Sequence, residues 1–333
     1  MTSNPDDLSG RTARMDPAKF LADLERKPEV LANLADHLEA HDPWGVLPMA
    51  SRFVLLGMGS SAYAAGVSAA RLRAHGVNAV ADLASTDLLP GADGHTVVVA
   101  ISASGGSRET RAAAAHYRDK APVVLVTNVA EGALAQDLEG GVHERVDLRA
   151  GVEEGGVASR SFQHTLALLL ALEPRVARAD LDVPNLVRRS AAACEDLLRS
   201  RGEWLPELRA RLVGPHGVHV VAPARRLSSA QQSALMLREG PRIPAYACET
   251  GDWSHVDVYL TKTTDYRMLL LGGSPWEDEL LRWTGERGST VVAVGTEVEG
   301  TAMTIRYAGD EDDDVRLLTE VLVAELLAAD LWL

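Results

Sequence analysis

The chain has 333 residues, a net charge of −14 and an apolar fraction of 46%. Its length suits two domains of ordinary size, and the apolar fraction suffices for large cores. The acidic charge argues against a nucleic-acid partner, because binding to a phosphate backbone requires a basic surface. No apolar stretch approaches the ~20 residues of a membrane-spanning helix, so we expect no membrane partner.

The N-terminal residues and the cysteines bear on the compartment. The first residues are polar and acidic, which is not typical of a signal peptide. The two cysteines, Cys194 and Cys248, do not have the spacing of a metal site, and free thiols suit a reducing environment. We therefore expect a cytoplasmic protein without disulfide, metal or cofactor.

The first half of the chain alternates between strand and helix patterns. After a polar tail of about 14 residues, helical spacing predicts a helix over 17–41. Apolar runs then predict strands, and Ala-rich or amphipathic stretches predict helices. The strands are 52–56, 77–82, 96–101 and 122–127, and the helices are 61–75 and 108–118. Such alternation is typical of a parallel sheet with helices on both faces.

The second half repeats this plan after a mainly helical stretch from about 161 to 200, whose most apolar part (165–173) we expect to be a buried helix. The expected strands are 217–222, 243–247, 267–271 and 289–294, and the helices are 228–239, 276–287 and 313–333. The fold class is therefore α/β, with two lobes that are each a doubly wound parallel sheet. The expected divisions are 1–45 (tail and helix), 46–175 (first lobe), 176–210 (helical linker) and 211–333 (second lobe and last helix).

Three segments of the first lobe are rich in serine and glycine: 57–61 (GMGSS), 102–107 (SASGGS) and 155–159 (GGVAS). The first two follow a strand and lead into a helix. Ligands of open parallel sheets bind beyond the carboxyl ends of the strands, where helix N-termini attract anions. Serine and glycine also make ordinary caps and turns, but two such strand ends in one sheet favour a phosphate site.

A dinucleotide site is the alternative for the first segment. Residues 57–62 match G-x-G-x-x-A, and Asp82 lies near the distance expected of a ribose-binding acid. This alternative leaves the serine-rich second segment unexplained.

The order of these segments resembles that of the SIS (sugar isomerase) family, including the isomerase half of glucosamine-6-phosphate synthase. The resemblance covers about residues 40–300 and implies two SIS-type lobes that bind a phosphorylated amino sugar. Family members commonly carry Gln at the position of Ala103 and Thr at that of Ser107. The implied substrate-binding residues are Ser60, Ser61, Ser102, Ala103, Ser104, Ser107, Val157 and Ser159.

The resemblance also implies catalytic residues in the second lobe. Glu239, at the end of a predicted helix, stands where the family has the base that moves the sugar proton, and His255 stands where the family has the residue that helps open the ring. A carboxylate base and a histidine proton shuttle suit this chemistry. Glu249 is a second acid/base candidate, and Trp253 is expected to be a packing residue. Without the resemblance, surface roles for Glu239 and His255 are the usual interpretation.

Lysine is scarce: the four are Lys19, Lys27, Lys120 and Lys262. The synthase has a lysine where Met236 stands, and another in its C-terminal tail that forms a Schiff base. We therefore expect no covalent amine catalysis and no delivery of ammonia from glutamine. A site without lysine favours a dehydratase or lyase acting on N-acetylglucosamine 6-phosphate. Isomerisation or deamination of glucosamine or fructose 6-phosphate remain alternatives.

A non-catalytic sugar-phosphate sensor is a further alternative, since SIS lobes also serve as ligand-sensing domains of regulators. A sensor has no need of Glu239 as a base. The family resemblance also implies a homodimer, in which the 249–255 loop acts in the neighbouring subunit's site.

Overall fold

A computed structural model of the chain describes residues 15–45, 47–129, 131–137 and 142–333. The polar tail expected over 1–14 lies outside the described residues. Within them, no helix combines the length and the apolar character needed to cross a membrane.

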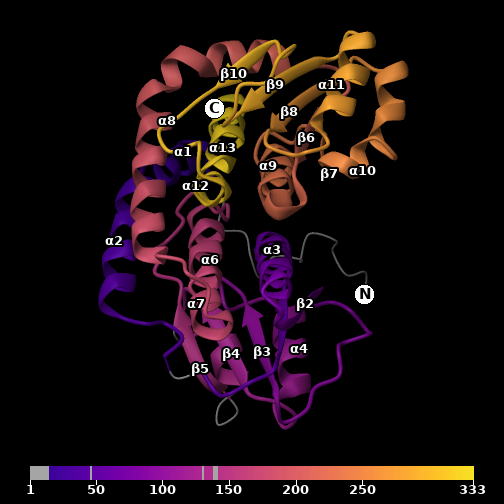
Figure 1. Cartoon of the computed structure of the whole chain (residues 1–333). Coiled ribbons are helices and arrows are strands. Elements are labelled where there is room, and N and C mark those ends of the chain that lie inside the picture. The colour runs from indigo at the N-terminus through magenta and orange to yellow at the C-terminus, as the bar shows by residue number, and fades with distance from the viewer. Residues whose placement is uncertain (1–14, 46, 130, 138–141) are drawn as a thin grey trace, which may run out of the picture.

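Two parallel five-stranded sheets form two lobes, which confirms the predicted fold class (Figure 1). The first sheet has the order β2-β1-β3-β4-β5, and the second has the order β10-β9-β8-β6-β7. The two orders are equivalent, with β6 in the place of β1 and β8 in that of β3. The first sheet comprises β1 (Arg52–Gly57), β2 (Asn78–Leu83), β3 (Thr96–Ile101), β4 (Val123–Thr127) and β5 (Val142–Asp147). The second comprises β6 (Val218–Ala222), β7 (Ala245–Glu249), β8 (Arg267–Leu271), β9 (Thr290–Val294) and β10 (Met303–Ile305).

Helices connect the strands and cover the sheets. Those of the first lobe are α3 (Ser60–Ala74), α4 (Arg108–Tyr117), α5 (Ala133–Asp137), α6 (Arg160–Leu170) and α7 (Leu172–Ala177). Those of the second are η1 (Ala224–Arg226), α9 (Leu227–Glu239), α10 (Thr250–Trp253), η2 (Asp257–Lys262), α11 (Glu277–Glu286), α12 (Asp313–Thr319) and α13 (Val321–Trp332). The N-terminal pair is α1 (Pro17–Glu25) and α2 (Lys27–Ala40), and α8 (Val183–Leu212) runs along both lobes (Figure 1).

The structure differs from the expected elements at several places, among them the C-terminal stretch 313–333, which forms the two helices α12 and α13. The single helix expected over 17–41 is interrupted at Arg26, where Pro28 in the first turn of α2 lacks the N–H that would continue α1. The strands β5 and β10 were not expected, because β5 (VHERVD) carries charged residues and β10 has only three residues. The long helix α8 continues through Pro206 to Leu212, beyond the expected end of the linker.

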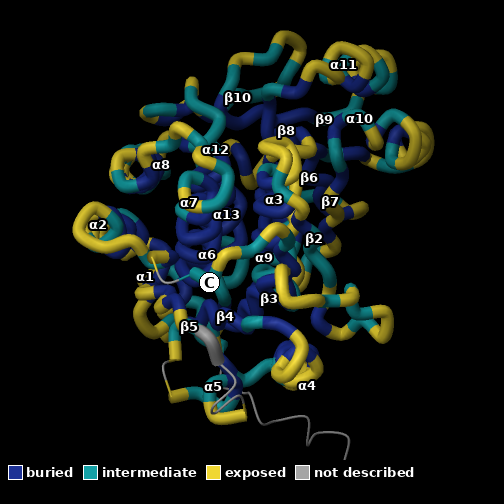
Figure 2. The backbone as a smooth tube through the Cα atoms, turned by 60° about the horizontal axis from the view of Figure 1, so that its bottom comes forward, coloured by how far each residue is buried: buried dark blue, intermediate teal, exposed yellow. Residues whose placement is uncertain are grey.

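The two lobes share one hydrophobic core. Residues alternate along the strands, so that Phe53 and Leu55 face this shared core while Val54 and Leu56 face a second core outside the first sheet. The shared core runs without a break into the second lobe through α9 and α13. Figure 2 shows α6 and α13 as mainly buried tubes, whereas α4 and α11 lie on the outside. Helix α6, which contains most of the apolar stretch 165–173, is buried at all eleven residues, as predicted.

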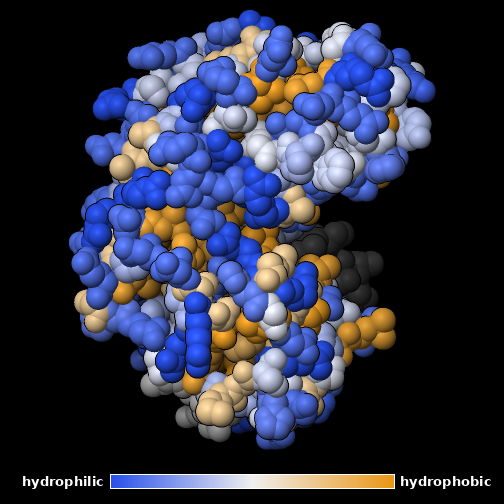
Figure 3. Space-filling model, in the orientation of Figure 1, coloured by the Kyte–Doolittle hydropathy of each residue, from blue (hydrophilic) through white to orange (hydrophobic). Residues whose placement is uncertain are grey.

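Arg71 on α3 adds a polar link between the lobes. It contacts Glu173 of the first lobe and Asp314 on α12 of the second, each at 2.6 Å. Figure 3 shows the two lobes as separate masses joined along one side, with a mainly hydrophilic surface on this face.

Candidate active site

A cavity of about 740 Å³ opens at the carboxyl end of the first sheet, where β1 and β3 lie side by side and their connections leave in opposite directions. This is the switch point at which open α/β sheets bind ligands. Seven of the predicted site residues line it together with Glu239 from α9 of the second lobe. These seven are Ser60, Ser61, Ser102, Ala103, Ser104, Ser107 and Val157.

The turn from β1 into α3 depends on two glycines. Gly59, the N-cap of α3, has a φ of +51°, a conformation that side chains other than glycine rarely adopt. A Cβ atom on Gly57 would lie 2.8 Å from the Cβ of Ser61 and 3.0 Å from the nitrogen of Ala62. Glycine at both positions therefore lets the first turn of α3 begin directly at the cavity. The N–H groups of a helix's first turn have no partner within the helix and favour an anion.

The loop from β3 into α4 brings hydroxyls to the same cavity. Ser102 is buried directly after β3, and Ser104 accepts a hydrogen bond from the N–H of Gly106 at 3.3 Å. Ser107 caps α4 by accepting from the N–H of Thr110 at 3.3 Å, and it donates to Glu109 at 3.0 Å. The hydroxyl of Ser107 is thus held in place by α4. A ligand would compete with Glu109 for the hydrogen bond that this hydroxyl donates.

A third wall is formed by residues 151–158, which two side chains from other elements hold in place. Asn128, after β4, donates to the carbonyl of Gly151 at 2.6 Å and accepts from the N–H of Ala150 at 3.0 Å. Asp23 of α1 accepts from the N–H of Gly155 at 2.8 Å and from the buried Arg160 at 2.7 Å. Helix α1, far away in sequence, is therefore part of the support of this cavity.

Glu153 in this wall could not be predicted from local sequence. Its carboxylate accepts from the N–H groups of Ser159 at 2.7 Å and Ser161 at 3.0 Å, at the N-terminus of α6. A carboxylate six residues ahead of the N-cap residue is not a recognisable capping pattern. The buried Ser159 itself does not line the cavity, although the sequence predicted it there.

Glu239 faces the cavity from the last residue of α9. Burial raises the pKa of its carboxyl group above the ordinary value, and the negative charge of Glu153 raises it further. A carboxylate with a raised pKa is a stronger base towards carbon acids than an exposed one. The described charged residues that line the cavity are Glu109, Glu153 and Glu239, so any bound phosphate would be held by hydroxyl and N–H groups.

Glu249 and His255 lie apart from this cavity within one chain. Glu249 ends β7 and caps α10, where its carboxylate accepts from the N–H groups of Gly251 at 2.8 Å and Asp252 at 2.9 Å. His255 is exposed just after α10. Neither lines the cavity that contains Glu239. Trp253 is fully buried and donates to the hydroxyl of Tyr266 at 2.8 Å, as expected of a packing residue.

Asp82, the acid of the dinucleotide alternative, does not line the cavity either. It lies in the edge strand β2, and its carboxylate accepts from the N–H of Leu83 at 3.0 Å. The structure therefore does not bring this acid to the serine-rich loops.

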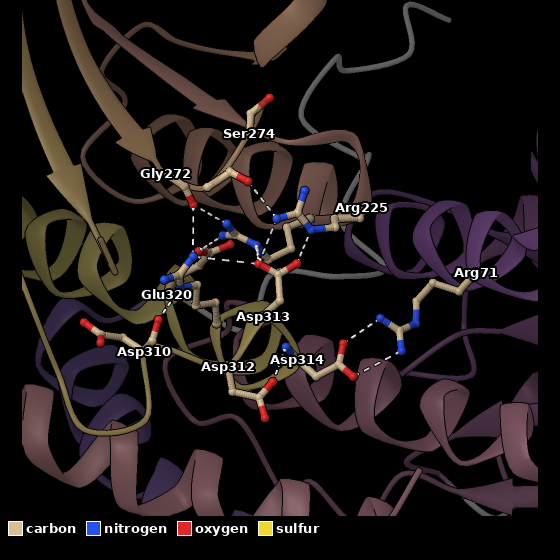
Figure 4. Close-up of polar contacts among 12 residues, drawn as sticks. Arg71, Arg225, Gly272, Ser274, Asp310, Asp312, Asp313, Asp314 and Glu320 are labelled. Atoms are coloured by element: carbon tan, nitrogen blue, oxygen red, sulfur yellow. Dashed lines mark hydrogen bonds and ion pairs between the residues drawn. The ribbon is translucent and has the colours of Figure 1, made fainter. Parts of the chain in front are cut away.

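The equivalent edge of the second sheet is filled by charged side chains (Figure 4). Arg226, which is 1% exposed, contacts Glu320, Asp313 and the carbonyl of Gly272. Arg225 contacts Asp313 and donates to the carbonyl of Gly273 at 2.8 Å. Burial raises the pKa of Glu320 to about 7, although Arg226 lowers it.

These features define a two-lobed α/β protein with a hydroxyl-rich cavity at the switch point of its first sheet. Residues 47–173 match the family model of the SIS domain, and the chain is similar in sequence to glutamine–fructose-6-phosphate aminotransferases. The Aeropyrum pernix aminotransferase is 28% identical over 270 residues, which cover 74% of this chain and 42% of that protein. The chain thus spans less than half the length of this relative.

Solved structures share the fold over almost the whole chain. The C-terminal domain of the glucosamine-fructose-6-phosphate aminotransferase from Francisella tularensis has a TM-score of 0.77 at 14% identity, covering 94% of this chain and 95% of that one. Tagatose-6-phosphate ketose/aldose isomerase from Escherichia coli has a TM-score of 0.78 at 17% identity, covering 93% and 91%. At these identities the likeness shows the fold alone.

Proposed function

We propose that this protein is an amino-sugar-6-phosphate enzyme in which Glu239 abstracts the proton at C2 of the open-chain sugar. The observation that carries the proposal is the position of Glu239 in the wall of the Ser/Gly-lined cavity. A phosphate bound by the β1–α3 and β3–α4 loops would anchor one end of the sugar. Glu239 would then reach the carbon next to the carbonyl from the opposite lobe.

The favoured reaction is dehydration of N-acetylglucosamine 6-phosphate. After Glu239 takes the C2 proton, the electron pair forms the C2–C3 double bond, and the C3 hydroxyl group takes a proton from the protonated Glu239 and leaves as water. Lysine catalyses such reactions through a Schiff base with the sugar carbonyl, and no lysine is among the described residues that line the cavity, so the proposed reaction uses acid and base groups alone. Reprotonation at C1 instead would give aldose–ketose isomerisation, and loss of the amine would give deamination.

Proton NMR in heavy water tests the proposal and separates these reactions. The protein is mixed in turn with N-acetylglucosamine 6-phosphate, glucosamine 6-phosphate and fructose 6-phosphate. We expect loss of the C2 proton signal and a new vinyl signal with the N-acetyl sugar. A product that keeps its C3 hydroxyl contradicts dehydration. No change with any sugar, together with thermal stabilisation by one of them, supports a sensor.

We further propose that the enzyme is a homodimer in which His255 assists ring opening in the partner subunit's site. His255 is exposed beside the large apolar residues Val256, Tyr259 and Leu260, whose side chains are also exposed. Exposed apolar groups close together are typical of a protein interface.

Mixing two inactive variants tests this arrangement. Glu239→Gln and His255→Ala homodimers are unfolded together and refolded, so that mixed dimers form. If each site combines Glu239 from one subunit and His255 from the other, one site of each mixed dimer is intact and activity returns. A monomer in solution, or no recovery of activity, contradicts the proposal. The same design with Glu249→Gln tests Glu249 as a second acid.

A further inference from the structure

Gln232 connects the two walls of the cavity. It lies in α9, is fully buried, and its Nε2 donates to the carbonyl of Ala158 at 2.8 Å. Ala158 lines the cavity from the first lobe. Glu239 lies seven residues further along α9, two helical turns away on the same face. One helix therefore contacts the loop of the first lobe and presents the proposed base to the same cavity.

The side chain of Gln232 stabilises the fold less than an apolar side chain of the same shape would. Its Oε1 is buried and has no hydrogen-bond partner within the described part of the chain. A buried acceptor without a partner destabilises a fold, whereas an apolar side chain of the same shape does not have this cost. Such local conflicts with stability are expected where a residue serves function.

We infer that Gln232 is a positioning residue, which fixes the 151–158 wall to α9 and so sets the distance between Glu239 and the bound sugar. This inference rests on the proposed function. The hydrogen bond acts across the junction of the lobes, because the phosphate-binding loops belong to the first lobe and α9 to the second. If this bond is lost, the phosphate loops remain intact while the base moves relative to the sugar.

The variant Gln232→Met tests the inference, because methionine has a similar length but no N–H group. Gln231→Met is the matched control, since its neighbour Gln231 is less buried and makes no hydrogen bond to the 151–158 wall among the described residues. For Gln232→Met we expect a fall in kcat of about 10- to 100-fold, the loss that misplacement by about 1 Å can cause. We expect KM and the affinity for inorganic phosphate to stay within about 2-fold, and Tm to stay equal or rise.

The outcomes separate positioning from a structural role. A fall in kcat that accompanies a lower Tm, or an equal fall in Gln231→Met, overturns the inference. An unchanged kcat in Gln232→Met overturns it as well.

A second measurement does not depend on turnover. Amide hydrogen exchange across residues 151–162 is expected to be about 2- to 10-fold faster in Gln232→Met, which corresponds to the loss of one hydrogen bond. Unchanged exchange overturns the inference even if kcat falls. If the wild-type protein shows no turnover, the proposed function fails, and this exchange result alone decides whether Gln232 holds the wall.

Discussion

The carboxyl edges of the two sheets have the same strand order, but small glycine and serine residues lie at the first edge and charged side chains lie at the second. At the first, the β1 and β3 strands lead into Gly57, Gly59 and a row of serines, and a cavity of about 740 Å³ remains open. At the second, Arg225 and Arg226 follow β6 and form ion pairs that fill the equivalent place (Figure 4). The switch point of an α/β sheet is therefore available in both lobes, and the size and charge of the next few residues decide whether it can receive a ligand.

We expect the largest effect, on the rate of C2 proton loss, at Glu239, which faces the cavity from the second lobe. Glu239→Gln should lower the rate of C2 proton loss about 10²- to 10⁴-fold, the usual contribution of a positioned base. Glu109→Gln removes the same charge at another residue that lines the cavity, on α4 of the first lobe, and should keep most of the activity. Proton NMR with N-acetylglucosamine 6-phosphate measures both rates. Equal rates of C2 proton loss in Glu239→Gln and the wild type would contradict the role of Glu239 as the base.

We expect the ion pairs at the carboxyl edge of the second sheet to contribute to stability and not to ligand binding. Arg226→Met leaves the buried Glu320 without its cation and should lower the free energy of unfolding by about 3–5 kcal/mol. The double variant Arg226→Met/Glu320→Leu should recover most of this loss, because it removes both buried charges. Urea denaturation gives the free energies. A change in phosphate affinity in the folded double variant would show that this edge also affects the ligand.

One glycine at the carboxyl edge of each sheet allows a direct comparison of the edges: Gly57 ends β1, and Gly272 follows β8. Gly57→Ala should displace the start of α3 and weaken the binding of inorganic phosphate about 10-fold, because the new Cβ would overlap with Ser61. Gly272→Ala should lower stability by about 1–3 kcal/mol without a change in phosphate affinity, because its Cβ would overlap with Thr296. Calorimetric titration and urea denaturation measure the two quantities. A weaker affinity in both variants would contradict separate roles for the two edges.

The smallest expected effect is on the free energy of unfolding, because burial of the ionised Glu239 destabilises the folded state. Burial raises the pKa of Glu239, so the fold favours the protonated carboxyl group. This contribution to the free energy of unfolding is complete when the pH is below the ordinary carboxyl pKa, and it is lost as the pH rises through the raised pKa. Glu239→Gln cannot ionise, so it should be more stable than the wild type at pH 7 to 8, and the difference should vanish at low pH. Unfolding followed from pH 4 to 8 measures this difference. A variant that is less stable at neutral pH would contradict the inferred burial cost.

The alternation of short apolar runs and helices was sufficient to predict the two sheets. The strands β5 and β10 escaped prediction because β5 has charged residues within its short run and β10 is only three residues long. The phosphate-binding loops were predictable because the local order strand, Ser/Gly loop and helix carries the signal. Glu153, Asn128 and Asp23 were not, because each acts on backbone groups that only the tertiary structure brings close.

The core that passes through both lobes has a consequence for how the molecule unfolds. Side chains from α1, α3, α6, α8, α9 and α13 belong to one continuous apolar cluster. Neither half can lose its packing without exposing the apolar surface of the other, so folding is cooperative across the lobes. The molecule should melt in a single calorimetric transition, and cleavage between the lobes should release no stable half. The two sheets look like separate domains in topology, but thermodynamically they are one.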